Sequence, residues 1–345
     1  MGSVNFLKSE AGRQTDHGTP VAPTFQMPVT GNYTDAQEEH VAPWDSGSWI
    51  AGEESVKVND FANCEFSGSL AFEMLPMFFF AGYRYLAPEG SFTYKDGIDL
   101  QTAGAPSPYT FRFGAQDELL ADGGGPAVQL ANAYCQSLTL SGGINARAIA
   151  FTSPWFAGGV DDNEEKGHPF VATATPDPRT YMIALGNNFR LRDATATGGE
   201  FTFNDATDKT DCLIIDWELV VNFGTQPKWG ADGGGASYCG VRFTQPSIEF
   251  RPTIRTNKQT WQLIRAKYNK RIFQELELQV LGPGGTEDTS AKFHLTGQWV
   301  SVPTGHARSN EEVVMNPVFR AKRYPAQTTT PHLFDWEIKG QYEHA

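Results

Sequence analysis

The chain has 345 residues, of which 40% are hydrophobic and 19% charged, so it can bury a sizeable core and is not disordered throughout. Its 35 glycines and its aromatic content of 12% favour β structure with many turns. The net charge of −13 argues against a protein that holds nucleic acid, because such proteins neutralise phosphates with lysine and arginine.

The negative charge is concentrated in the first half of the chain. Residues 1–165 carry 7 lysines and arginines against 21 aspartates and glutamates, a net charge of −14. Residues 166–345 carry 20 against 19, a net charge of +1. The asymmetry has three interpretations: a solubility device, complementarity between copies of the chain, or a surface that repels an anion.

The N-terminal residues 1–48 are rich in glycine, proline, threonine and aspartate, with little periodicity. This composition predicts an extended N-terminal arm. The first 18 residues also lack the apolar core of a signal peptide. The most apolar window, residues 74–83, is far shorter than the roughly 18 residues that a membrane span needs, so no span is expected.

A short helix is expected at the end of the segment GSLAFEMLPMFFFAGY. Pro76 suits a first helical position and Gly82 suits a C-terminal stop. A second helix is expected over residues 256–270, because Trp261, Ile264 and Tyr268 recur at helical spacing.

The segment SLTLSGGINARAIAFTSPWFAGG, residues 137–159, predicts two strands joined at Gly142 and Gly143. Its second strand carries apolar residues on both faces, because Ile149 and Phe151 share a face with polar residues. One interpretation is that the spare apolar face lies against a neighbouring subunit. The alternative is a strand buried on both sides in a monomer.

An acidic, proline-containing stretch over residues 157–180 is the best candidate boundary. Alternating strands recur after it, and each half contains long strands, a short aromatic helix and further strands. We therefore predict a mainly β protein with β-sandwich or barrel modules, short flanking helices and two modules in tandem. The predicted divisions are an arm over 1–48 and modules over 49–165 and 166–345.

No catalytic motif stands out, and the seven histidines have no metal-binding spacing. The four cysteines, which also lack such spacing, are expected to be free thiols in a reducing compartment, the alternative being two disulfides. The Glu164–Glu165 pair could act in a glycosidase, but a solvated loop explains it more simply. Trp217, Trp299 and Trp336 could form a sugar platform, although alternation places them in the core. We expect no enzymatic activity, metal or cofactor.

The order and style of several segments resemble the major tail (tail tube) proteins of long-tailed bacteriophages. The resemblance covers PVAPTFQMPVTGNYTDAQEEHVAPWDSGSWIAG, the helix followed by GSFTYKDG, then PYTFRFG and CQSLTLSGGINARAIAFTSPWFAGG. The second half, with DWELVVNFG, PSIEFRPTIRTN and ELELQVLG, is similar to the second copy in family members whose module is duplicated.

The resemblance implies a structural virion protein that assembles with itself into rings, stacked into a tube through which the genome is delivered. The rings would be trimeric with pseudo-sixfold symmetry, or hexameric. Other phage tail proteins would be partners, and the chain would be made in the host bacterial cytoplasm. DNA would pass without specific binding, along a wall expected to be at least partly acidic. The alternative function is a carbohydrate-binding or hydrolytic β-sandwich protein.

Eight aromatic or apolar residues are the candidates for contacts between subunits. They lie in the predicted arm, at its end, and in the strand and exit of the 137–159 segment: Phe25, Tyr33, Trp44, Trp49, Ile149, Phe151, Trp155 and Phe156.

Overall fold

The computed structural model describes most of the chain, with gaps. The described residues are 6–29, 31–35, 38–41, 55–59, 61–90, 92–99, 104–116, 127–161, 181–197, 200–201, 214–231, 236–256, 258–283, 288–302, 307–309, 312–323 and 332–340. The statements below refer to these residues.

The fold is mainly β, as the alternating sequence predicts, with large antiparallel sheets and few helices. The elements of residues 6–161 are β1 (Phe6–Arg13), β2 (Phe25–Gln26), β3 (Gly31–Asp35), β4 (Glu38–Val41), β5 (Ser55–Asn59), β6 (Phe61–Ser69), a 3-10 turn (Phe72–Met74), α1 (Leu75–Gly82), β7 (Thr93–Asp99), β8 (Tyr109–Gln116), β9 (Val128–Cys135), β10 (Ser137–Gly143), β11 (Ala150–Gly158) and β12 (Val160–Asp161).

The elements after residue 181 are again mostly strands. They are β13 (Phe189–Thr197), β14 (Glu200–Phe201), β15 (Ile214–Asn222), β16 (Thr225–Ala231), β17 (Ala236–Phe243), β18 (Ser247–Arg255), α2 (Lys258–Asn269), β19 (Gln274–Leu281), β20 (Ser290–Ser301), β21 (Ala307–Ser309), β22 (Glu312–Met315), β23 (Val318–Ala321) and β24 (His332–Lys339).

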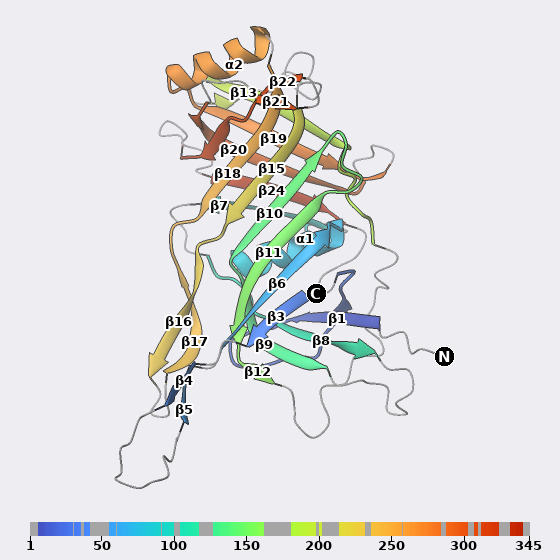
Figure 1. Ribbon diagram of the computed structural model, residues 1–345, viewed down its shortest axis with the longest axis vertical. Coiled ribbons are helices and arrows are strands. Elements are labelled where there is room, and N and C mark those ends of the chain that lie inside the picture. Colours follow the sequence, from blue (N-terminus) through green and yellow to red (C-terminus); the bar gives the residue numbers. More distant parts are fainter. Residues whose placement is uncertain are drawn as a thin grey trace.

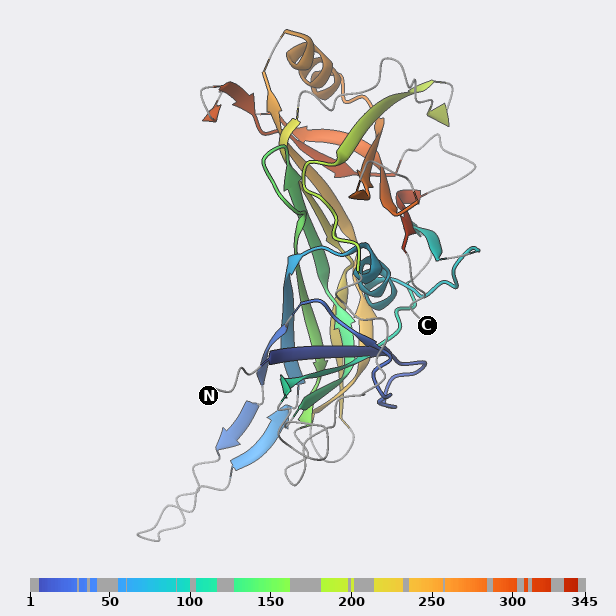
Figure 2. The same cartoon turned by 90° about the vertical axis from the view of Figure 1, so that its right-hand side faces the viewer.

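A long central sheet forms the front layer of the molecule in Figure 1. Its strands pair in the order β3–β6–β11–β10–β15–β18, and β18 then pairs with β22 and β23. Two smaller sheets lie behind it, as the turned view in Figure 2 makes clear, and each is joined to it by strand pairing, through β9 with β11 and through β20 with β23. One holds β1, β2, β8, β9 and β12; the other holds β13, β19, β20, β24 and β7.

The central sheet is apolar on the face that turns towards the rear sheets. Leu138 and Leu140 of β10, and Trp217 and Leu219 of β15, are buried on this face. They alternate with more exposed residues because successive side chains of a strand point to opposite faces. The prediction that the three tryptophans serve as core is confirmed, since all are buried: Trp217, Trp299 and Trp336.

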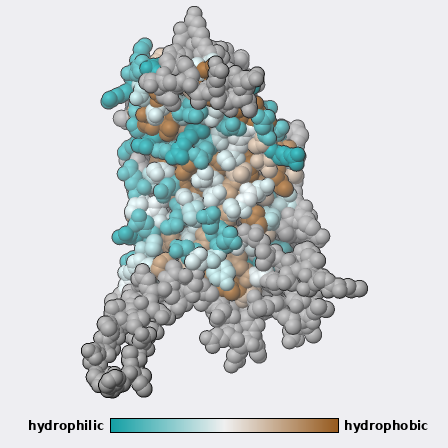
Figure 3. Space-filling view, in the orientation of Figure 1, coloured by the Kyte–Doolittle hydropathy of each residue, from teal (hydrophilic) through white to brown (hydrophobic). Residues whose placement is uncertain are grey.

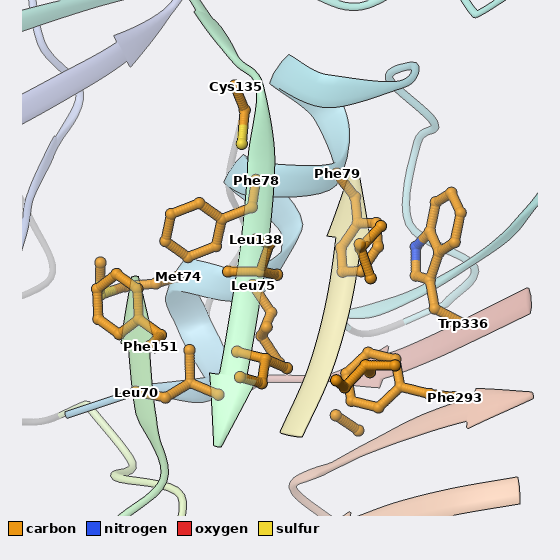
Figure 4. Close-up of a cluster of buried hydrophobic side chains, with 14 of the residues drawn as sticks. Leu70, Met74, Leu75, Phe78, Phe79, Cys135, Leu138, Phe151, Phe293 and Trp336 are labelled. Atoms are coloured by element: carbon orange, nitrogen blue, oxygen red, sulfur yellow. The ribbon is translucent and has the colours of Figure 1, made fainter. Parts of the chain in front are cut away.

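Helix α1 fills the space between the layers. Pro76 lies in its first turn and the helix ends at Gly82, as predicted. All eight of its residues are buried, so the helix must be covered on every side. Phe78 packs on Phe151 of the central sheet, with ring centroids 5.3 Å apart. Phe79 stacks on Trp336 of β24 at 4.4 Å, and Figure 4 shows the two contacts on opposite sides of the helix.

Helix α2 differs from α1 because it packs on one side only. Ile264 is buried, and Tyr268 has 36% of its surface exposed. The helix lies at one end of the molecule, beside β20 (Figure 1). The predicted helix over 256–270 therefore exists and packs beside β20 of the second-half sheet.

Strand β1 lies inside the predicted N-terminal arm, yet it belongs to a sheet of the body. All eight of its residues pair with β8, from Phe6↔Gln116 to Arg13↔Tyr109. Ala11 is fully buried. The strand shows little hydrophobic alternation because small and polar residues, Ser9 and Ala11 among them, occupy its buried positions.

The packing of α1 predicts the cost of truncating its central aromatic residue. Phe79→Ala should lower the free energy of unfolding by about 3–5 kcal/mol, because a cavity would open beside the Trp336 ring. Denaturant unfolding followed by circular dichroism measures the loss. Tyr268→Ala on α2 is the control and should change stability by less than about 1 kcal/mol. Equal losses in the two variants would contradict the central role of α1.

Candidate interaction surfaces

The described residues offer several surfaces for interaction. Within the described ranges, no group of three or more His, Cys, Asp or Glu residues could hold a metal ion. The thiols of Cys64 and Cys135 are free and buried, and burial raises the pKa of both far above the usual range. No described helix is long and apolar enough to cross a membrane.

The two halves of the chain pair their strands in the same order. In the first half β1 pairs with β8 and β8 with β9; in the second half β13 pairs with β19 and β19 with β20. Likewise β3 pairs with β6, which leads into α1, and β15 pairs with β18, which leads into α2. Finally β11 pairs with β6 and β9, as β23 pairs with β18 and β20.

The two sets of strands that share this pairing order, here called the repeated units, meet edge to edge in the central sheet. Strand β10 pairs with β15 over seven residue pairs, from Ser137↔Asn222 to Gly143↔Asp216. Strand β21 holds the corresponding place in the second half, because it follows β20 and pairs with β22 as β10 follows β9 and pairs with β11. Among the described strands, nothing pairs with the outer edge of β21 or of β3. These are the two open edges of the central sheet.

The face of the central sheet that turns away from the core is polar, and we call it the polar face. It points towards the viewer in Figure 1, and the space-filling view in Figure 3 shows its middle in pale and teal shades. Hydroxyl and amide groups dominate its first-half part, and Glu65 is the charged residue there. That part carries Asn32, Thr34, Asn63, Glu65, Ser67, Ser69, Ser137, Thr139, Ser141 and Thr152.

The second-half part of the polar face carries a chain of ion pairs. Arg251 Nη1 donates to Glu218 Oε2 at 3.0 Å across β15 and β18. Arg251 Nη2 also donates to Glu249 Oε2 at 2.8 Å, and Arg320 Nη2 donates to Glu249 Oε1 at 2.6 Å. A hollow of about 510 Å³ adjoins these ion pairs, and its lining includes Ser141, Glu218 and Arg251. The two arginines are therefore held by carboxylates of the same face.

Two hairpins project from the lower end of the molecule and form a second sheet. The connection between β3 and β6 contains β4 and β5, and the connection between β15 and β18 contains β16 and β17. The four strands pair in the order β16–β17–β5–β4. Equivalent connections of the two repeated units thus join into one projection, which extends beyond the body in Figures 1 and 2.

An aromatic cluster fixes the base of this projection. The ring of Tyr238 on β17 meets the rings of Phe156 at 5.8 Å and His17 at 5.0 Å. Tyr238 Oη also donates to the carbonyl oxygen of Asn132 at 3.2 Å. Burial lowers the pKa of His17, which favours the neutral ring, although a backbone hydrogen bond with Tyr238 opposes the shift. The base of the projection is thus packed on β9 and β11.

A row of alternating charges crosses the rear sheet of the second half. Arg192, Glu277, His294 and Asp335 lie opposite one another on β13, β19, β20 and β24. His294 Nε2 lies 3.2 Å from Glu277 Oε2. Burial alone would lower the pKa of His294, but the hydrogen bond with Glu275 and the charges of Glu277, Glu275 and Asp335 raise it.

Most of the predicted interface residues lie in the core of the chain itself. Tyr33 on β3 is 40% exposed, whereas five others are buried: Phe25, Ile149, Phe151, Trp155 and Phe156. The spare apolar side of the 137–159 segment is covered within the chain. Ile149, just before β11, is fully buried, and the Phe156 ring packs on Tyr134 and Tyr238. Trp44 and Trp49 lie outside the described residues, as does the Glu164–Glu165 pair.

Sequence analysis missed the ion pairs of the polar face. In the strand SIEFRPTIR, Glu249 and Arg251 alternate with buried Ile248 and Phe250, which indicates an exposed charged side. The partner Arg320 lies 71 residues further on, so the pattern along one strand could not identify the contact.

Comparisons with known proteins add no assignment. No known protein-family model matches the chain, and a search of curated proteins finds no match.

The contacts of His294 predict a pH dependence of stability. A raised pKa in the folded state gives stabilisation that is complete below the unfolded pKa of about 6.5 and is lost as pH rises through the higher folded pKa. The wild-type chain should therefore exceed His294→Gln in stability by more at about pH 6 than at about pH 9, in denaturant titrations at both values. A constant difference would contradict a charged His294.

Proposed function

We propose that the chain is a structural subunit that polymerises into stacked rings, forming the tail tube of a long-tailed bacteriophage. The proposal rests on the resemblance described above and on one structural observation. Two units with the same pairing order are joined edge to edge in the central sheet, and the sheet keeps open edges at β3 and β21. A neighbour is needed to cover such edges, and a second copy of the chain provides both partners.

In the proposed ring, the open edge of β21 in one copy pairs with β3 of the next copy. This contact repeats the antiparallel β10–β15 junction that joins the units inside each chain. Because each chain contributes two units, three chains give a ring of six units with pseudo-sixfold symmetry. A head-to-tail interface of this kind closes into a ring when the rotation between copies matches.

Among the described residues, the polar face is the face of the central sheet that is left available to line a channel. The opposite face is packed against α1 and the rear sheets, as Phe78 and Phe151 illustrate. The hydroxyl and amide groups of the polar face suit a wall in contact with water. Genome delivery through this channel requires DNA to pass without specific binding, and the chain acts without catalysis or cofactor.

Stacking is assigned to the projecting hairpins. They extend along the long axis of the molecule, away from the body and in line with the strands of the central sheet (Figures 1 and 2). In that direction they reach the next ring or another tail protein at the end of the tube. The tryptophans that a sugar-binding alternative would use are in the core, so that alternative gains no support from them.

Cysteine cross-linking tests the proposed contact between copies. Thr34→Cys on β3 is combined in turn with cysteine at Ala307, Arg308 or Ser309 on β21, in a Cys239→Ser background that removes the exposed thiol among the described cysteines. At least one pair should form closed, disulfide-linked trimers under mild oxidation, seen on non-reducing gels, because paired strands bring such side chains within bonding distance.

The matched controls carry one new cysteine each and should give no closed species. Rings seen by negative-stain microscopy should keep the same diameter in the linked and unlinked samples. A closed hexamer on the gel would contradict the trimeric ring. Assembly without any cross-link between β3 and β21 would contradict the proposed interface.

Shortening the projection tests its role in stacking. Replacing residues 230–237, the end of the β16–β17 hairpin beyond Trp229 and Tyr238, with a tight turn should leave single rings intact and remove tubes, because the ring edges lie elsewhere. Sedimentation and negative-stain microscopy distinguish the two states. Tubes of normal length from the shortened chain would contradict this assignment.

A further inference from the structure

The polar face holds phosphate-binding groups that are already occupied. Guanidinium groups form strong, paired hydrogen bonds with phosphate oxygens. On this face, however, each oxygen of Glu249 accepts two hydrogen bonds from one arginine: Oε1 from Arg320 at 2.6 and 2.9 Å, and Oε2 from Arg251 at 2.8 and 3.2 Å. Glu218 occupies the remaining side of Arg251.

The geometry of the strands fixes this arrangement. Glu249 lies directly opposite Arg320 across β18 and β23, and Glu218 lies directly opposite Arg251 across β15 and β18. Such cross-strand pairs have short separations between their Cβ atoms. The Glu249 side chain is 17% exposed, whereas those of Arg251 and Arg320 are 47% and 51% exposed. The guanidinium groups are therefore within reach of a polymer in solution, and the carboxylate that holds them is shielded.

We propose that Glu218 and Glu249 keep the polar face from binding a phosphate polymer, by holding Arg251 and Arg320. The polymer is duplex DNA, because this inference rests on the proposed function, in which DNA passes along the polar face. Arginines without carboxylate partners would bind such a polymer and slow its passage, since each phosphate contact releases counterions and adds affinity. Arginines that are paired with carboxylates give a wall that does not bind DNA.

The chemistry of the face favours this partner over a protein. Hydroxyls, amides and charged side chains make up most of the polar face, so a protein would find few apolar side chains to bury there. The ion pairs also persist over a wide pH range. Burial alone would raise the pKa of Glu249, but hydrogen bonds from Arg251 and Arg320 and their charges lower it, so the carboxylate stays ionised well into the acid range.

Charge-neutral substitutions test the proposal on the full chain. In the double variant Glu218→Gln/Glu249→Gln, both arginines lose their carboxylates. The probe is fluorescently labelled duplex DNA, and the measurement is anisotropy over a range of salt concentrations near 0.05–0.15 M. The variant should bind at least about tenfold more tightly than the wild-type chain. The slope of the logarithm of its binding constant against the logarithm of the salt concentration should become more negative by about 2, because two phosphate contacts are gained.

The control variant Glu65→Gln/Asp216→Asn removes the same amount of charge from the polar face. Neither residue forms an ion pair in the described part of the chain, so DNA binding should stay at the wild-type level. Adding Arg251→Gln and Arg320→Gln to the test variant should abolish the gain. Circular dichroism and melting verify the fold, and the single variant Glu249→Gln replaces the double one if the latter unfolds.

Three results would overturn the proposal: a folded test variant that binds no DNA, an equal gain in the control variant, or tight binding by the wild-type chain. Ring formation is measured separately on the wild-type chain by negative-stain microscopy. Rings without a gain in the test variant would overturn only the role of the two glutamates. A gain in a chain that never forms rings would support that role and count against the proposed tube.

Discussion

The complete burial of α1 is the constraint on which the rest of the structure depends. A helix that is apolar on all sides cannot lie on a surface, so the layers must close around it. Phe78 packs on β11, whereas Phe79 packs on Phe223, Phe293 and Trp336, which follow the candidate boundary in the sequence. One helix of the first half thereby supplies core to the second half, and the buried apolar residues of both halves form a single cluster.

In the part of the chain that the structure describes, this packing leaves the central sheet with one uncovered face and two unpaired edges. Its inner face is occupied by α1 and the rear sheets, so neither the helix nor these sheets can move away without opening the core. The polar face and the edges at β3 and β21 are therefore the parts that can serve an external role. The ion pairs of Glu249 lie on this polar face and not in the core.

Local patterns predicted those elements whose cause is local. Pro76 and Gly82 bounded α1 correctly, and alternation placed Trp217 and Trp336 in the core. Apolar periodicity shows that a residue is buried but not by what, so Phe151 and Trp155 suggested a subunit contact although the chain covers them itself. Non-local features left no signal that a single sequence could reveal. The joined hairpins and the contact of Glu249 with Arg320 arise only when distant strands pair.

The polar face is less acidic than the net charge of residues 1–165 suggests. Residues 1–165 carry a net charge of −14, yet Glu65 is the charged residue that their strands place on the described polar face. A strongly acidic wall would repel DNA over a Debye length of about 8 Å and so oppose its entry into a narrow tube. A wall of hydroxyls and closed ion pairs neither repels nor holds the polymer. In the proposed tube, smooth passage therefore follows from neutralised contacts on the wall.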